Sequence, residues 1–261
     1  MKRSRMHSLG RRGVLSAVCA VLFLLSAAAL LWGPLHASRQ EKAQNNLLPS
    51  TAQSTVSSKP AQESTDSPAV LPQYEELVAQ NPDMVGWVRI DGTGIDYPVM
   101  YTGDDFYLDH GFDRKPSKSG VPYIDKRCSV GPFGTNTIVY AHHMKNGTMF
   151  ARLLRYKDKR YYEQHPTIRF DTLYEEQEYD ILAVFESKVY KKSDTVFKHY
   201  NFLNAESEQE FNEYIQGIGA QALYDTGVTA QYGDELITLM TCAYHTENGR
   251  FVVVAKKKSA E

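Results

Sequence analysis

"LITLMTCAYHTENGRFVVVAKKK", residues 236–258, decides the fold, because it reads as two β-strands joined by a polar turn. The first strand-like run stops at Cys242, and the second starts beside Arg250. Runs of β-branched and apolar residues on either side of a short polar segment are typical of a β-hairpin. A hairpin of this size would bring the Cys242 thiol and the Arg250 guanidinium together at one end of two adjacent strands.

Similar strand-like runs recur through the rest of the chain from residue 84 onward. They are rich in valine, isoleucine and tyrosine and are separated by Gly, Pro, Asn and Asp; they cover residues 84–90, 97–100, 120–125, 135–142, 167–171 and 178–190. Helical patterns occur only at residues 73–80, 147–156 and 205–225. Many short strands with few helices predict a mostly β fold, in which a mainly antiparallel sheet closes into a barrel.

The bulk composition excludes several classes of function. The net charge is −2, so the basic surplus that is typical of nucleic-acid-binding proteins is absent. There are three cysteines, Cys19, Cys128 and Cys242, and they form neither a CxxC motif nor a zinc-type Cys/His spacing. No acidic run has the spacing of a calcium loop. We therefore expect no metal, no cofactor and no nucleic-acid partner.

The N-terminal third divides into three segments before the globular domain. Residues 1–12 are basic and lack acids, and residues 13–33 carry no charge over a length that can span a bilayer as a helix. We interpret residues 1–12 as a cytoplasmic tail and residues 13–33 as a single-pass transmembrane anchor, which places the rest of the chain outside the cell. A cleavable signal peptide is the alternative, with "LHAS" at 35–38 as a weak cleavage site.

Residues 34–70 differ in composition from both neighbours. They are rich in Ser, Thr, Gln, Ala and Pro and lack aromatic residues, so they cannot bury enough apolar surface to offset the entropy of ordering. We predict a flexible extracellular stalk over 34–70, followed by the catalytic domain over 71–261.

A cysteine at the end of a strand can serve as a nucleophile if its proton is removed. A thiol has an ordinary pKa of about 8.5, so a neighbouring histidine is needed to accept the proton or to stabilise the thiolate. Arginine stays charged and can stabilise an oxyanion or hold a peptide backbone. Cys242 with a histidine and Arg250 would suffice for acyl transfer through a thioester. The alternative is a structural Cys242, either buried or disulfide-bonded to Cys128.

The partner histidine is one of eight. Five are unsuited, because they flank the apolar segment, lie in polar connections expected to be solvated, or sit in the tight turn after the thiol: His7, His36, His165, His199 and His245. His110 lies in a loop and stays open. His142 and His143 end the strand at 135–142, where successive side chains point to opposite faces, so only one of them can face the thiol. Periodicity does not choose between the two.

These residues carry a resemblance to a known family. "TLMTC" at 238–242, with Arg250 ahead of "FVVVAKK", resembles the TLxTC signature of sortases, the membrane-anchored cysteine transpeptidases of Gram-positive bacteria. "NTIVYAHHMKNGTMF" and "FYLDHGFDRKPSKSGVPYID" are similar to class B sortases in particular. The resemblance covers about residues 72–258.

The resemblance implies a role for each candidate residue. Cys242 would be the nucleophile, His142 the acid and base, and Arg250 the group that positions substrate and stabilises the oxyanion. His142 is favoured over His143 because the family histidine directly follows a small residue, here Ala141. The implied fold is a closed eight-stranded β-barrel with N-terminal helices and a long helix between the sixth and seventh strands.

The resemblance also implies partners. Cys242 would cleave a C-terminal sorting motif of surface proteins, of the Asn-Pro-x-Thr-Asn or Ser/Asn-Pro-x-Thr-Gly kind, after the threonine, and a peptidoglycan amine would resolve the thioester. Leu239, Met240 and Thr241 are candidate substrate contacts. Met240 departs from the family, in which many class B members carry serine at this place, so the recognised motif can differ.

Other functions remain open at this point. A Cys-dependent cell-wall hydrolase or peptidase would use the same residue types, although the context of Cys242 differs from that of L,D-transpeptidases. A sortase that polymerises pili through a lysine amine is a variant of the same chemistry. A non-enzymatic surface module with a structural Cys242 is the third reading.

Overall fold

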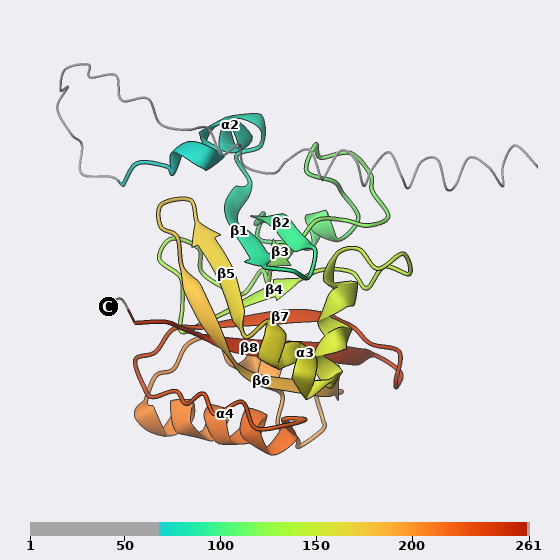
Figure 1. The fold of residues 1–261 in the computed structure, drawn as a ribbon, viewed down its shortest axis with the longest axis vertical. Helices are drawn as coiled ribbons and strands as arrows, with labels where there is room; N and C mark the ends of the chain where they lie inside the picture. Colours follow the sequence, from blue (N-terminus) through green and yellow to red (C-terminus); the bar gives the residue numbers. More distant parts are fainter. Residues whose placement is uncertain (1–67, 260–261) are drawn as a thin grey trace, which may run out of the picture. The chain divides into compact units, whose positions relative to one another are not determined.

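The computed structural model describes residues 68–259, which form a closed eight-stranded β-barrel (Figure 1). The strands are β1 (Met84–Ile90), β2 (Ile95–Met100), β3 (Tyr123–Ile124), β4 (Asn136–Tyr140), β5 (Thr167–Thr172), β6 (Glu178–Lys188), β7 (Leu236–Cys242) and β8 (Gly249–Lys257). They follow the order β1-β2-β3-β4-β7-β8-β6-β5 around the barrel. The predicted mostly β, closed eight-stranded barrel is confirmed.

The barrel mixes two kinds of strand pairing. β2 with β3 and β4 with β7 are parallel, and the other neighbouring pairs are antiparallel. The expected hairpin of residues 236–258 is the antiparallel pair of β7 and β8, in register from Leu236 opposite Lys256 to Cys242 opposite Arg250. The parallel contact of β4 with β7 was not foreseen, because strands distant in sequence leave no local signal of their pairing.

The helices lie on the outside of the barrel. α2 (Pro72–Gln80) lies next to β1, and α4 (Glu208–Gln221) lies along the side formed by β6 (Figure 1). α4 begins after Ser207, whose hydroxyl accepts a hydrogen bond from the Glu210 N–H at 3.2 Å and so caps the helix. It is the expected long helix between the sixth and seventh strands, and α2 is the N-terminal helix within the described residues.

Shorter helical turns fill the remaining connections. These are η1 (Phe106–Leu108), η2 (Phe150–Lys157), α3 (Lys159–Gln164) and η3 (His199–Asn201). η2 occupies the expected helical segment at 147–156, but as a 3-10 helix. Its apolar residues Phe150, Leu153 and Tyr156 are fully buried, so their packing against the barrel holds the turn.

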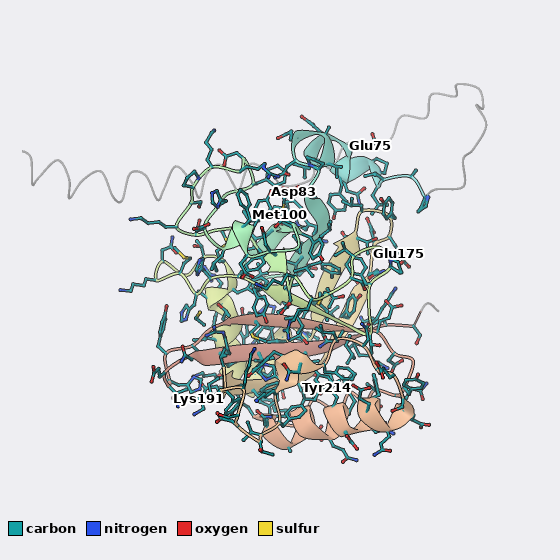
Figure 2. The ribbon with its side chains drawn as sticks, turned by 180° about the vertical axis from the view of Figure 1, so that it is seen from behind. Glu75, Asp83, Met100, Glu175, Lys191 and Tyr214 are labelled. Atoms are coloured by element: carbon teal, nitrogen blue, oxygen red, sulfur yellow. The ribbon has the colours of Figure 1, made fainter. Side chains whose placement is uncertain are left out.

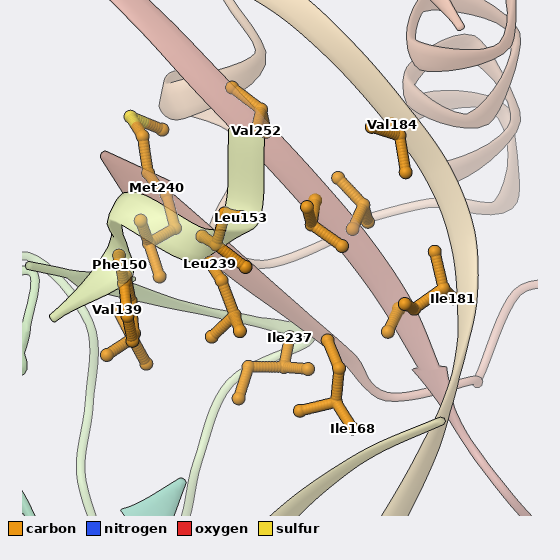
Figure 3. Close-up of a cluster of buried hydrophobic side chains, with 14 of the residues drawn as sticks. Val139, Phe150, Leu153, Ile168, Ile181, Val184, Ile237, Leu239, Met240 and Val252 are labelled. Atoms are coloured by element: carbon orange, nitrogen blue, oxygen red, sulfur yellow. The ribbon is translucent and has the colours of Figure 1, made fainter. Parts of the chain in front are cut away.

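The main hydrophobic core fills the barrel and continues beneath η2 and α4. Leu239 and Val252 lie among the apolar side chains that β4, β6, β7 and η2 contribute to this core (Figure 3). On the outer side, Tyr214 of α4 is 2% exposed and closes the space between the helix and the sheet (Figure 2). Because β7 and β8 are covered on both faces, their sequences are almost continuously apolar rather than alternating.

The predicted N-terminal organisation lies outside the described residues. This applies to the cytoplasmic tail (1–12), the transmembrane anchor (13–33) and nearly all of the stalk (34–70). Between residues 68 and 259, no helix combines the length and the apolar character that crossing a membrane requires.

His199 is buried, and the expectation that it is solvated was wrong. Only 1% of its surface is exposed, because η3 tucks the ring between Phe185 and Tyr200, with ring centroids 5.1 Å from each. Burial, with a further contribution from the positive charge of Arg250, lowers the pKa of His199 to about 4. The polar sequence around His199 gave no sign that the connection folds back onto β6.

The buried His199 makes the fold sensitive to acid. Between pH 6.5 and 4 the unfolded chain takes up a proton at this position and the folded chain does not, so the free energy of unfolding falls as the pH falls. We expect His199 to account for a loss of about 2 kcal/mol between pH 7 and pH 5. Denaturant titration of the full chain at both pH values measures it. His199→Phe, which keeps a ring between Phe185 and Tyr200, should show a smaller loss; an equal loss in both proteins would contradict the assignment.

Candidate active site

Cys242 and Arg250 face each other across two strands. Cys242 is the last residue of β7, and it pairs directly with Arg250 at the start of β8. Side chains of directly opposed residues in an antiparallel pair lie on the same face of the sheet. The hairpin therefore places the thiol and the guanidinium side by side, as the sequence predicted.

His142 reaches the same row from the other side of β7. β4 runs parallel to β7 with Tyr140 beside Met240, and the Ala141 N–H donates to the Met240 carbonyl at 3.2 Å. Two residues further along each chain, His142 comes level with Cys242. Since side chains two residues apart share a face, the register sets Cys242 between His142 and Arg250.

The ring of His142 is held by a main-chain carbonyl. Its Nε2 lies 2.7 Å from the Leu108 oxygen at the end of η1. A carbonyl oxygen can only accept, so this contact assigns a proton to Nε2. Nδ1 is then the nitrogen that can gain or lose a proton, which is the requirement for an acid and base beside a thiol. No sequence signal pointed to Leu108.

His143 turns toward the main chain of Cys242 instead of its thiol. Its Nδ1 lies 3.1 Å from the Cys242 carbonyl oxygen, and its ring packs against Tyr244 at 5.3 Å between centroids. The two histidines thus address different atoms of the same residue, which the alternation of side chains did not foretell.

Arg250 keeps donors available at the site. Its two hydrogen bonds, to the carbonyls of Asn248 at 3.4 Å and Gly249 at 3.0 Å, both use Nη1. A guanidinium has five N–H donors in a planar fork, so the remaining donors can be directed at a substrate oxygen.

A buried carboxylate supports the strand that carries His142. Asp125 accepts hydrogen bonds from the Tyr140 hydroxyl at 3.0 Å and from Arg127 at 2.7 and 2.9 Å. Burial by itself raises the pKa of Asp125, but the hydrogen bonds from Arg127 outweigh it and hold the pKa below its usual range. Arg127 also donates to the Tyr200 carbonyl at 2.7 Å, which ties the connection after β6 to the hairpin of β3 and β4.

The two cysteines of the barrel are separate thiols. Both are free, with Cys242 partly exposed and Cys128 buried. Cys128 packs against β4, where the Ile138 N–H donates to its sulfur at 3.5 Å, and burial raises its pKa to about 11. A disulfide between Cys128 and Cys242 is thereby excluded in this structure.

Leu239, Met240 and Thr241 are packed within the protein. Their exposed fractions are 0%, 1% and 2%, and the Thr241 hydroxyl donates to the Ala141 carbonyl at 2.8 Å. A bound peptide could reach these positions only through the main chain or after neighbouring side chains move. Their contact with substrate stays a prediction.

The remaining candidates are engaged elsewhere. His110 stacks on Phe106 at 3.9 Å, and its Nδ1 contacts the Phe106 carbonyl and Asp109. His245, in the turn between β7 and β8, forms an ion pair with Glu186 at 3.3 Å. Within residues 68–259, no three His, Cys, Asp or Glu side chains are grouped so that they could hold a metal ion.

Comparison with known proteins agrees with this arrangement. Residues 88–258 match the sortase domain family. The chain belongs to this family. Sortase B of Listeria monocytogenes is 34% identical over 190 residues, covering 72% of this chain and 74% of that protein. Sortase B of Staphylococcus aureus is 31% identical over 191 residues, covering 72% and 75%.

Solved structures of class B sortases share the fold. Sortase B from B. anthracis in complex with AAEK1 has a TM-score of 0.70 at 27% identity, covering 87% of this chain and 99% of that one. The S. aureus sortase B–substrate complex has a TM-score of 0.65 at 29% identity, covering 74% and 88%. The sortase is accordingly a cysteine transpeptidase similar to class B members.

The difference between the two thiols can be measured directly. At pH 7.5 we expect iodoacetamide to alkylate Cys242 in the folded protein and to spare Cys128, because the buried Cys128 has a pKa of about 11 and almost no thiolate at that pH. Peptide mapping by mass spectrometry assigns each labelled cysteine. Unfolding in guanidinium is the control and should expose Cys128 to the reagent. Equal labelling of both thiols in the folded protein would contradict the assignment.

Proposed function

We propose that this sortase cleaves a C-terminal sorting motif of surface proteins after its threonine and joins the new carboxyl end to an amine of the cell-wall peptidoglycan. The observation that carries the proposal is the single row formed by His142, Cys242 and Arg250 on β4, β7 and β8. The row contains a nucleophile, a proton carrier and a fixed positive charge, which are the parts that acyl transfer requires.

In the first half of the reaction the thiolate of Cys242 attacks the threonine carbonyl carbon. His142 holds the proton from the thiol on Nδ1, and the carbonyl oxygen becomes an oxyanion that Arg250 stabilises. The C–N bond then breaks, and the departing amine takes the proton from His142. The threonine acyl group remains on Cys242 as a thioester.

In the second half an amine attacks the thioester carbon. His142 accepts a proton from the incoming nitrogen, and the C–S bond breaks to release a new amide and regenerate Cys242 as a thiolate. Water in place of the amine would give an acid and no ligation. The acceptor therefore decides whether the product is transpeptidated or hydrolysed.

The motif is proposed to be of the Asn-Pro-x-Thr-Asn or Ser/Asn-Pro-x-Thr-Gly kind. Support comes from class B relatives, because S. aureus sortase B has been solved as a substrate complex and a sortase B has been solved as a complex with triglycine. Met240 stands where many relatives carry serine, so we expect the preferred motif to depart from that of such relatives.

The place of action is proposed from the sequence. The basic residues 1–12 and the uncharged residues 13–33 would hold the chain in the cell membrane, and residues 34–70 would act as a stalk. The catalytic domain would then meet its protein substrate and the peptidoglycan amine outside the cell.

The function is tested by peptide cleavage with and without an amine. A library of fluorogenic peptides that contain these motifs, incubated with the full chain, should yield a fragment ending in threonine. Addition of triglycine or an amine from the peptidoglycan stem should convert that fragment to a ligated product, detected by mass spectrometry. Cys242→Ala and His142→Ala should each lower turnover by about a thousandfold or more, since one removes the nucleophile and the other its proton carrier.

Two outcomes would oppose this function. Cleavage that persists in Cys242→Ala would remove the nucleophile from the mechanism. Acid as the sole product at saturating amine would favour a hydrolase. Cys128→Ala is the matched control for loss of a thiol, and its turnover should equal that of the parent chain.

Arg250 is tested by a change that keeps its charge. Arg250→Lys replaces a planar fork by a single ammonium, so it should lower kcat/KM by about a hundredfold although the charge is retained. Steady-state kinetics on the best peptide measures this loss, and Arg160→Lys, at an exposed arginine in α3, should behave as the parent chain. Near-normal turnover of Arg250→Lys would show that the guanidinium fork is not used.

A further inference from the structure

β4 parts from β7 beside the nucleophile. The last main-chain bond of their ladder before the site runs from the Ala141 N–H to the Met240 carbonyl. In a parallel ladder the next donor from the same strand comes two residues later, so the N–H of residue 143 would face the carbonyl of Cys242. The main chain of His143 instead forms an isolated antiparallel bridge with Met149.

The side chain of His143 takes the position that the ladder leaves vacant. Its Nδ1 lies 3.1 Å from the Cys242 carbonyl oxygen. Because that oxygen can only accept, Nδ1 carries a proton, and it does so in the neutral ring and in the imidazolium alike. The imidazole thus supplies the hydrogen bond that the backbone of β4 no longer gives to β7.

The segment around His143 is held in a fixed shape. The Phe150 N–H donates to the His142 carbonyl at 3.0 Å and closes the loop between them. Met149 has a φ of 54°, which is strained for a residue with a side chain, and its burial at 1% exposure keeps it there. A rigid loop fixes the direction of the His143 ring.

The same ring also contacts the chain beyond the nucleophile. Tyr244 packs on it with an angle of 31° between the ring planes. His143 is therefore bonded to Cys242 and packed against a residue two positions later, where β7 has ended and the turn to β8 begins. Without these contacts the main chain of Cys242 would be held from the β8 side only.

We propose that His143 is a positioning residue, whose Nδ1–H fixes the main chain of Cys242 and so sets the sulfur between His142 and Arg250. The inference rests on the proposed function, since the sulfur must be placed for attack on a peptide carbonyl. Small displacements of a reacting atom are costly, because the rate depends steeply on the geometry of approach. His143 acts through Cys242 and transfers no proton.

The experiment compares a change that keeps the donor with one that removes it. The amide nitrogen of asparagine is attached at the same branch point as Nδ1 of histidine, so His143→Asn retains a donor near the Cys242 carbonyl, whereas His143→Leu retains only bulk. We expect His143→Leu to lower kcat about tenfold, the worth of one hydrogen bond, with KM within about twofold. His143→Asn should stay within about threefold of the parent chain in kcat.

A second measurement does not depend on peptide turnover. The rate of alkylation of Cys242 by iodoacetamide in the full chain, followed by mass spectrometry, should change severalfold in His143→Leu and stay near the parent value in His143→Asn. His165→Leu is the matched control, because the Nδ1 of His165 also lies 2.8 Å from a carbonyl oxygen, that of Asp91. It should lose a similar bond and leave both rates unchanged. Thermal unfolding of all variants checks that each remains folded.

Three outcomes separate the possibilities. Parent-like kcat and alkylation in His143→Leu would overturn the inference. Equal impairment of His143→Asn and His143→Leu would also overturn it, because the donor would then not be what matters. If the parent chain cleaves no sorting peptide, the proposed function fails, and the alkylation rates alone still decide whether His143 positions Cys242.

Discussion

The position of β7 between a parallel and an antiparallel neighbour is the constraint on which the site depends. The antiparallel contact with β8 brings Arg250 to Cys242, and the parallel contact with β4 brings His142 from a strand far earlier in the chain. A shift of either contact by one residue would turn a functional side chain to the opposite face of the sheet. The chemistry is therefore a consequence of strand register, and the forces that fix the register are as important to the site as the three side chains.

Buried polar contacts specify that register more sharply than apolar packing can. Asn136 at the start of β4 accepts a hydrogen bond from the Thr238 hydroxyl of β7 at 2.8 Å and donates to the Phe202 carbonyl at 2.9 Å. Thr241 makes the second polar link between the same strands, to the Ala141 carbonyl. Apolar side chains could slide past one another at modest cost, but a slipped register would leave these buried groups without partners. The threonines of the TLMTC segment thus hold β7 against β4.

The neighbouring histidines illustrate how one strand end can serve two needs. His142 stays in the row of the sheet and is oriented by the Leu108 carbonyl. His143 leaves the sheet and binds the carbonyl of the nucleophile. The separation is possible because β4 ends at this point, so that one residue follows the register of β7 while the next is turned by the loop that closes on Phe150. One histidine is suited to carry a proton, and the other to hold a main chain.

The sequence by itself determined the class of the fold, the hairpin of β7 and β8, the helix between β6 and β7, and the pairing of Cys242 with Arg250. These follow from local patterns: apolar runs, turn residues, helical spacing and a short loop. The choice between His142 and His143 required either a family resemblance or the register of β4 on β7. The tertiary structure alone decided that parallel contact, the burial of His199 and of Met240, and the roles of Leu108 and Asp125. Each of these arises from segments distant in the chain, and the free energy of packing them together is not recorded in any local stretch of residues.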